Sequence, residues 1–254
     1  MPVLFAHLTH QIIAHAEDVF PHECCGAIID GEYHRFENVA DDPEQDFEFS
    51  NEDEFRLLAG PDASRTQAIV HSHPDGMLSP TASDMLAQIT TGLPFVIVAH
   101  DGGQWHYIEW GDHRLDDPLI ERPFEHGVYD CGSAVRSWYW QKKGILLPDF
   151  ARDDEWWGGL DAQGNIVPAS GDLYAENFAK AGFKELHVSA MTDLQEGDVF
   201  FYRLAKSGVE CHAGVYVGGD LIYHHLPKRL SREELLGPWF PRISRWVRYA
   251  GGHA

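Results

Sequence analysis

The sequence predicts an α+β protein made of two domains, and three observations support this prediction. Its 254 residues are long for one ordinary domain and sufficient for two. Segments with helical and strand periodicity alternate up to residue 112, and the pattern restarts after a polar, proline-containing stretch. The charge changes at the same place, because residues 1–112 carry 3 bases against 20 acids, whereas residues 113–254 carry 16 bases against 20 acids. We therefore expect a first domain over 1–112, a linker over 113–122 and a second domain over 123–254.

The first domain is expected to be a compact mixed α/β unit. Apolar residues near one face predict a first helix that Pro21 ends, Ser50 caps a second helix, and Gly92 closes a third. These helices are expected at 9–20, 51–59 and 81–91. Strands bounded by turn residues are expected at 25–30, 33–39, 67–73, 95–100 and 104–110.

The second domain begins with helices and continues with strands, an order typical of α+β folds. Gly144 and Gly182 follow the two expected helices, which cover 131–143 and 172–181. Strands are expected at 198–204, 210–217 and 221–226, with a further strand near 246–249.

Composition disfavours several classes of protein. A formal net charge of −21 repels phosphates, so we expect no nucleic-acid partner. No run of about 18 apolar residues occurs, so we expect no membrane-spanning segment, and residues 1–5 lack the basic start of a secretion signal, so we expect synthesis in the cytoplasm. Four cysteines are too few for a disulfide scaffold. The acidity of the first domain serves either solubility or a basic protein partner, and the sequence leaves both open.

The first group of residues with catalytic chemistry predicts a zinc site. His71 and His73 are two apart on a strand, so both side chains leave the same face, and Asp84 follows one turn into the next helix. Two imidazoles and a carboxylate suit Zn²⁺ and leave a fourth position for water, with Glu23 as the candidate base for that water. The pair Thr81 and Asp84 is equally explained as a helix capping box, and a strand-end histidine pair also occurs by chance.

Together these residues resemble the JAMM motif of the MPN-fold metallopeptidases. The resemblance rests on His71-x-His73-Pro74, on Thr81 and Asp84 at their spacing, and on the Pro-x-Glu-x-Cys-Gly element around Glu23. It covers residues 1–112 and implies His71, His73 and Asp84 as zinc ligands, with Glu23 as general acid and base. The family usually has Ser where this chain has Thr81, whose hydroxyl would support an oxyanion but whose methyl crowds the site.

The second group predicts a cysteine nucleophile. Cys131 lies at the start of an amphipathic helix, where the helix dipole favours a thiolate and lowers the cysteine pKa. His212 on a strand is the candidate base, and a third group must orient its imidazole. A hairpin turning on Gly218-Gly219 alone would bring His225 to His212, whereas a three-residue loop that includes Asp220 would bring His224. Spacing alone leaves this choice open, and a buried structural thiol is the alternative for Cys131.

This second group resembles the NlpC-type cysteine peptidases, which have a papain-like fold. The resemblance covers about residues 121–254 and rests on Asp-Cys at a helix start, a Gly-Asp strand motif at Gly197-Asp198, and a histidine twelve residues after His212. It implies Cys131 as nucleophile, His212 as base and His224 as orienting residue. This chain reads Cys-Gly-Ser where the family commonly has Cys-Ser-Gly.

Cys24 and Cys25, beside Glu23 in the first domain, are expected in the core, although either would be able to approach the zinc.

The order of the two domains resembles the tail assembly protein K family of long-tailed bacteriophages. The resemblance implies a virion tail-tip protein that meets other tail-tip proteins and cuts host peptidoglycan stem peptides during genome entry, at a bond between γ-D-glutamate and a diamino acid. For the zinc domain we expect amide hydrolysis by zinc-bound water, either of an isopeptide bond or of an assembly partner. Two alternatives remain, a non-catalytic structural or assembly hub and a cellular wall-remodelling enzyme, and the absence of a signal peptide argues against the second.

Overall fold

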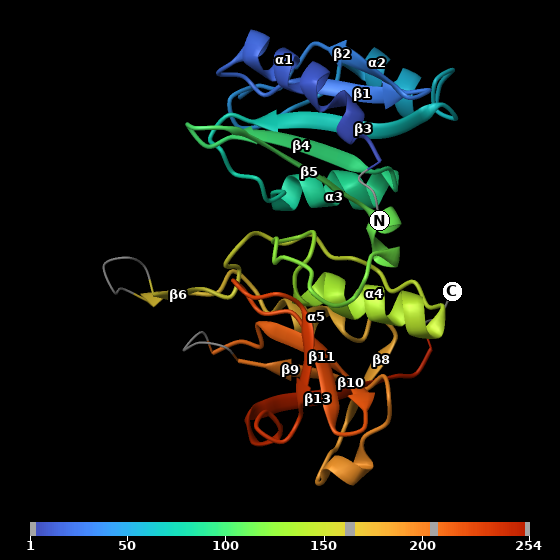
Figure 1. Ribbon diagram of the computed structural model, residues 1–254, viewed down its shortest axis with the longest axis vertical. Coiled ribbons are helices and arrows are strands. Elements are labelled where there is room, and N and C mark those ends of the chain that lie inside the picture. The colour runs from blue at the N-terminus through green and yellow to red at the C-terminus, as the bar shows by residue number, and fades with distance from the viewer. Residues whose placement is uncertain (1–3, 161–165, 204–207, 252–254) are drawn as a thin grey trace. The chain divides into compact units, whose positions relative to one another are not determined.

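The computed structural model describes residues 4–160, 166–203 and 208–251 (Figure 1). The chain divides into two compact units, an N-terminal unit of Met1–Arg114 and a C-terminal unit of Leu115–Ala254. Each unit contains a sheet of its own, and the predicted α+β class is confirmed. Within the described residues, no helix is both long and apolar enough to cross a membrane.

The N-terminal unit contains a five-stranded sheet in the order β2-β1-β3-β4-β5. Its strands are β1 (Cys25–Ile29), β2 (Glu32–Phe36), β3 (Thr66–His73), β4 (Phe95–His100) and β5 (Trp105–Trp110). Strands β3 and β4 run parallel, whereas the other neighbours are antiparallel. The parallel pair requires a crossover connection, which contains the helix that carries Asp84.

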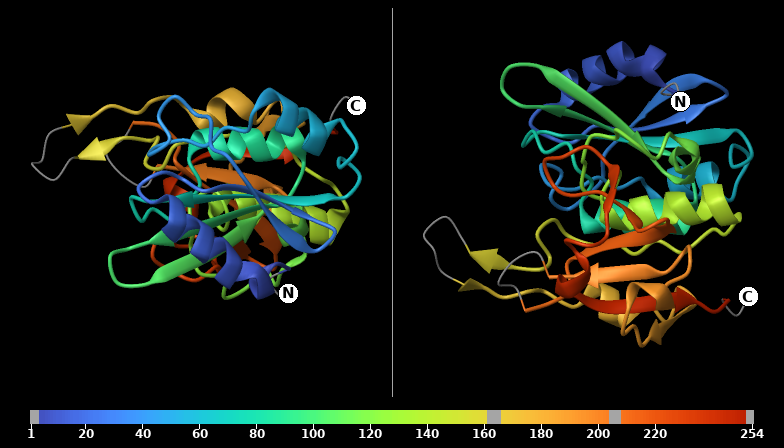
Figure 2. Two further views of the ribbon diagram at one scale, coloured as in Figure 1. Left: turned by 90° about the horizontal axis from the view of Figure 1, so that it is seen from above. Right: turned by 60° about the horizontal axis from the view of Figure 1, so that its bottom comes forward.

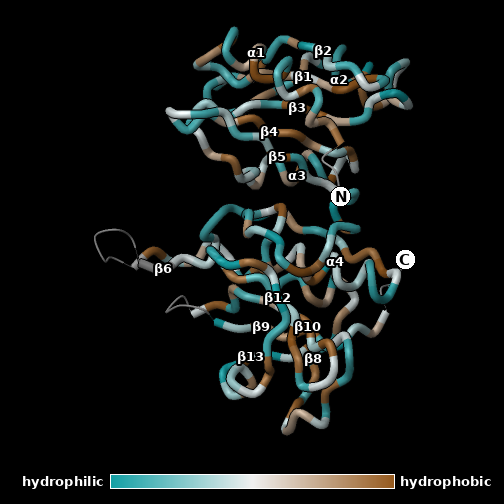
Figure 3. The backbone as a smooth tube through the Cα atoms, viewed as in Figure 1, coloured by the Kyte–Doolittle hydropathy of each residue, from teal (hydrophilic) through white to brown (hydrophobic). Residues whose placement is uncertain are grey.

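Three α-helices complete this unit: α1 (Thr9–Val19), α2 (Asn51–Leu58) and α3 (Ala82–Thr91). Helix α1 covers one face of the sheet, where its Ile12 packs into a core with Val70 and Val98 (Figure 1). Because side chains alternate along a strand, the neighbour of Val70, His71, faces the opposite side, where α3 lies. Strand β4 is mostly brown in Figure 3, in agreement with its apolar sequence.

The C-terminal unit contains a six-stranded sheet in the order β12-β11-β10-β9-β13-β8. Its strands are β8 (Phe183–Leu186), β9 (Val199–Tyr202), β10 (His212–Gly218), β11 (Leu221–His224), β12 (Arg232–Leu235) and β13 (Ile243–Tyr249). Helix α4 (Cys131–Lys143) packs on this sheet through Trp138 and Tyr139, which share a core with Val215. A short helix, α5 (Leu173–Asn177), completes the unit, and the pair β6 (Gly159–Leu160) and β7 (Ile166–Val167) lies outside the large sheet (Figure 2).

Several elements differ from the expected ones. Helix α5 covers only part of 172–181, and the sequence analysis missed β8 and β12 because short, polar strands lack a clear alternation. The expected strand 198–204 ends at Tyr202, and its residue 204 lies outside the described residues.

In the stretch expected as a linker, Arg122 is buried and donates a hydrogen bond to Ser137 Oγ of α4 at 2.9 Å, so this stretch packs on the C-terminal unit.

Two candidate active sites

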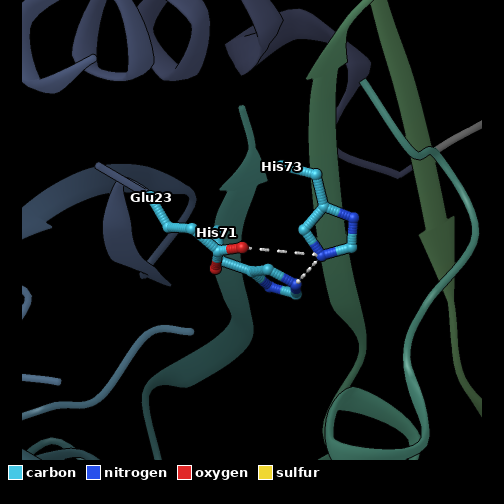
Figure 4. A group of neighbouring side chains, drawn as sticks. All are labelled: Glu23, His71 and His73. Carbon is cyan, nitrogen blue, oxygen red and sulfur yellow. Dashed lines mark hydrogen bonds and ion pairs between the residues drawn. The ribbon is translucent and has the colours of Figure 1, made fainter. Parts of the chain in front are cut away.

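Two buried histidines lie at the end of β3, and their side chains meet. His71 Nε2 and His73 Nε2 are 3.1 Å apart (Figure 4). His73 Nδ1 lies 2.6 Å from the carbonyl oxygen of Met77. Because a carbonyl only accepts, Nδ1 of His73 carries the proton and Nε2 keeps a lone pair for a ligand. The ring of His71 is held by stacking on Phe47, with ring centroids 4.3 Å apart.

Asp84 joins this pair from the first turn of α3. Its Oδ1 lies 3.2 Å from His71 Nε2, and its Oδ2 lies 3.4 Å from His73 Nε2. The capping box that competed with a ligand role is present as well, since the Thr81 N–H donates to Asp84 Oδ2 at 2.8 Å and the Asp84 N–H donates to Thr81 Oγ1 at 3.1 Å. The cap therefore fixes the carboxylate against the imidazoles. The Thr81 hydroxyl, which we expect to support an oxyanion, donates to Asp84 Oδ2 at 2.8 Å.

The carboxyl group of Glu23 approaches from the segment before β1. Its Oε1 lies 4.0 Å from His73 Nε2 (Figure 4). Ser72, which the sequence analysis missed, anchors this segment, because its hydroxyl accepts the N–H of Cys24 at 2.7 Å. Burial raises the pKa of Glu23 to about 8, against the opposing charge of His73. Burial also acts to raise the pKa of Asp84, but His71 and His73 outweigh it and hold that pKa well below its usual range.

The side chains of His71, His73 and Asp84, with Glu23 beside them, fit a zinc ion. Ligand atoms of Glu23, His71 and His73 all lie within 4.8 Å of one another. Bonds of about 2.0–2.1 Å in tetrahedral geometry require ligand atoms about 3.3 Å apart, which agrees with the 3.1 to 3.4 Å separations among His71, His73 and Asp84. Cys24 and Cys25 are buried and do not belong to this group.

A cleft of about 690 Å³ opens beside Asp84. Its walls combine apolar side chains, such as Phe47 and Phe49, with the carboxyl groups of Glu48 and Glu54. Asp84 belongs to the lining of this cleft, which therefore borders the candidate metal-ligating residues.

The second site surrounds the start of α4. Asp130 caps this helix, since its Oδ1 accepts the N–H of Ser133 at 2.9 Å and its own N–H donates to Ser133 Oγ at 2.7 Å. Ser133, two residues after Cys131, is therefore explained by its role in this capping box. Arg152, which the sequence analysis missed, pairs with Asp130 at 2.7 Å and fixes the helix start further. Cys131 is partly exposed, whereas the other three cysteines are buried.

Cys131 and His212 border the same cleft, which has a volume of about 360 Å³ and aromatic walls that include Trp156 and Trp157. Tyr174 of α5, also missed in the sequence, places its hydroxyl 3.0 Å from Cys131 Sγ. Burial raises the pKa of the Cys131 thiol to about 11, and the charge of Asp130 acts in the same direction. The expected lowering of this pKa by the helix start is not found, because desolvation outweighs it.

The hairpin of β10 and β11 places His224, rather than His225, beside His212. His212 Nε2 and His224 Nδ1 are 2.9 Å apart. His225 turns elsewhere, with its Nε2 3.1 Å from the carbonyl oxygen of Arg229. The expected three-residue loop does not form. Instead, a two-residue turn at Gly219 and Asp220, both with positive φ, combines with a register shift between Tyr216 and Gly218, and this combination gives the same side-chain parity.

Comparison with known proteins identifies the family of each half of the chain. Residues 5–110 match the family model described as prokaryotic homologs of the JAB domain, and residues 121–246 match the NlpC/P60 family. The chain is thus a two-domain protein with a JAB-like domain followed by an NlpC/P60 domain. It is 33% identical over 250 residues to the tail tip assembly protein K of Escherichia phage N15, covering 94% of this chain and 92% of the relative. The protein of the same name from Escherichia phage lambda is 34% identical over 167 residues, covering 66% of this chain and 73% of that one. The chain belongs to the tail tip assembly protein K family.

Among solved structures, an NLP/P60 family protein from Staphylococcus aureus, described as similar to a lipoprotein, aligns with 61% of this chain and 46% of its own. The identity is 19% and the TM-score 0.33, values too low to support a structural argument.

Proposed function

We propose that this chain is a tail-tip protein whose C-terminal unit hydrolyses peptide cross-links of the host cell wall during genome entry. The observation that carries this proposal is that Cys131 and His212 line one cleft, with His224 Nδ1 2.9 Å from His212 Nε2, in a chain of the tail tip assembly protein K family. By family resemblance, the bond would join γ-D-glutamate to a diamino acid. Other tail-tip proteins would hold the chain in the virion.

The chemistry would be acyl transfer through a thioester. His212 Nδ1 takes the proton of Cys131 Sγ as sulfur bonds to the substrate carbonyl carbon, and the same proton then goes to the leaving amine. Water, deprotonated by His212, attacks the thioester and releases the carboxylate and the thiol. The Tyr174 hydroxyl, 3.0 Å from Sγ, is placed to donate a hydrogen bond to the sulfur as charge develops.

Zymography on purified peptidoglycan separates an enzyme from a structural hub. We expect the full chain to produce a cleared zone and to release soluble peptides. Binding to the wall without any release would instead support the non-catalytic hub.

The pH dependence of wall cleavage should reflect the environment of His212. Burial, reinforced by His224 and His225, holds the pKa of His212 well below its usual value, so the imidazole stays unprotonated in mildly acidic solution. A base must be unprotonated to act, so the initial rate should be nearly constant from pH 7.5 to 6 and fall only at lower pH. Rates of fragment release across this range test the prediction, and a half-maximal rate at or above pH 6.5 would contradict it.

For the N-terminal unit, we propose zinc-dependent amide hydrolysis of an isopeptide-like bond or of an assembly partner. His71, His73 and Asp84 would hold the ion. When bound, zinc would supply Lewis acidity that polarises a carbonyl and lowers the pKa of the attacking water. Glu23, whose Oε1 lies 4.0 Å from His73 Nε2, would accept and return the proton.

Metal analysis tests the proposed zinc ligands. Protein purified without chelator should contain about one zinc per chain, and the double variant His71→Ala, His73→Ala should contain almost none, because it lacks both imidazole ligands. The variant His7→Ala, His10→Ala is a matched control, because these histidines are exposed and belong to the same unit. Wild-type protein without metal would contradict the proposal and leave this unit as a scaffold.

A further inference from the structure

Strand β12 brings a carboxylate to the far side of the histidine pair. Glu234 pairs with Ile222 across the β11–β12 ladder, two residues from the pair of His224 and Arg232, so the side chains of Glu234 and His224 lie on the same face. Glu234 Oε2 lies 3.4 Å from His224 Nε2. The His224 side chain is only 1% exposed, and its Nε2 makes no hydrogen bond within the described part of the chain, so this ion-pair contact brings the carboxylate to an otherwise unpartnered nitrogen.

Neighbouring side chains hold the Glu234 carboxylate in place. Trp239 Nε1 donates to Oε2 at 3.0 Å, and Arg232 pairs with Oε1. The Trp239 ring also packs edge-on against His224, with centroids 4.7 Å apart. The carboxylate is therefore oriented toward His224 by contacts that do not involve the cleft.

The positions of the protons follow from this chain of contacts. An ionised carboxylate only accepts, so it favours the tautomer of His224 with the proton on Nε2. His224 Nδ1 then has a lone pair and accepts the proton of His212 Nε2 across 2.9 Å. His212 Nδ1, which has no hydrogen-bond partner among the described residues, is left unprotonated and is the nitrogen available as a base.

We propose that Glu234 is a positioning residue of the peptidase site, which acts through His224 to keep His212 in the tautomer that accepts the Cys131 proton. The inference rests on the proposed function of this site. Without the carboxylate, His224 would also populate the tautomer with the proton on Nδ1. That tautomer would donate to His212 Nε2 and force the His212 proton onto Nδ1, where the ring cannot act as a base.

Nitrogen-15 NMR of the histidine rings tests the proposal directly in the full chain. His212 and His224 signals are assigned with His212→Ala and His224→Ala variants. We expect both rings of the wild type to be protonated at Nε2, and we expect Glu234→Ala to show a substantial fraction of the Nδ1-protonated form. A wild-type His224 protonated at Nδ1, or unchanged tautomers in Glu234→Ala, would overturn the proposal.

Kinetics of wall cleavage give the second arm. Glu234→Ala should lower kcat about 10–100-fold with little change in KM. The variant loses a contact that supports His224, but it loses no contact with the substrate. Glu234→Gln should lose less, since its amide oxygen keeps the place of Oε2 opposite His224 Nε2 and accepts from Trp239. Glu233→Ala, an exposed change on the same strand, should match the wild type. Equal loss in the Ala and Gln variants would indicate a merely structural role. If the wild-type protein does not cleave the cell wall, the proposed function is wrong. The NMR measurement of the histidine tautomers still decides the role of Glu234 in that case.

Discussion

Replacing Cys131 by alanine is expected to abolish the release of peptide fragments from purified cell wall. Alanine cannot form the thioester, and in a comparable nucleophile–histidine triad the loss of the nucleophile lowers kcat by about 10⁶-fold. The half-buried position of Cys131 at the start of α4 makes alanine compatible with the fold, because Asp130 and Ser133 still form the capping box. The measurement is the turbidity loss of a peptidoglycan suspension, with circular dichroism to verify folding.

The double variant Cys131→Ala, Glu23→Gln determines which unit cuts the wall. If Cys131→Ala still releases fragments and the double variant does not, the zinc unit is the wall-cutting unit. If the double variant also releases them, neither proposed site is responsible. Both outcomes contradict the assignment of wall cleavage to Cys131.

Replacing His224 by alanine is expected to lower turnover by about 10⁴-fold, whereas replacing His225 should have little effect. The estimate follows from the cost of a wrong imidazole tautomer in serine proteases. His224 is the group 2.9 Å from His212 Nε2, while His225 Nε2 lies near the carbonyl oxygen of Arg229. Initial rates of fragment release for the two variants, measured side by side, check this prediction.

The two histidines make a matched pair, because both are buried and adjacent in sequence. A general loss of stability would lower both rates, which thermal unfolding of each variant would reveal. Greater loss in the His225 variant, with both variants folded, would contradict the assignment of His224 as the orienting residue.

Local signals in the sequence were sufficient for much of the fold. Helix α4 has the predicted bounds, because Asp130 caps its start and Gly144, with a φ of 65°, closes its end. Strand β4 also has its predicted bounds, since a short apolar run between a helix-ending glycine and a turn is typical of a buried strand. The His71 and His73 pair follows directly from the two-residue period of β3.

The sequence correctly predicted that His224 shares a face with His212, but it predicted a different hairpin loop. The sequence indicated that Asp220 takes part in the turn, and it does so with a φ of 61°. The register shift within β10 was not predicted, because nothing in the residues Val215 to Gly218 distinguishes a strand with a bulge from a longer loop. A bulge with a two-residue turn and a three-residue loop have the same effect. Compared with a hairpin that turns on Gly218-Gly219 alone, each places the side chains of β11 on the opposite face.

The supporting residues could not be predicted, because their partners are distant in sequence or lie on elements without a clear pattern. Arg152 meets Asp130 across 22 residues, and Tyr174 meets Cys131 across 43. Glu234 lies on a four-residue edge strand whose sequence, Arg-Glu-Glu-Leu, has no apolar alternation. The high pKa of Cys131 was missed for a related reason, since burial depends on tertiary packing and not on its position at a helix start.

Mass spectrometry of the fragments that the wild-type chain releases from purified peptidoglycan tests the central claim most directly. We expect soluble fragments with new termini inside the stem peptides, at the bond between γ-D-glutamate and the diamino acid, with glycan strands intact. These fragments should be absent from a parallel digestion with Cys131→Ala. Fragments cut only in the glycan, or no fragments from folded wild-type protein, would contradict the assignment of the C-terminal unit as a cell-wall peptidase.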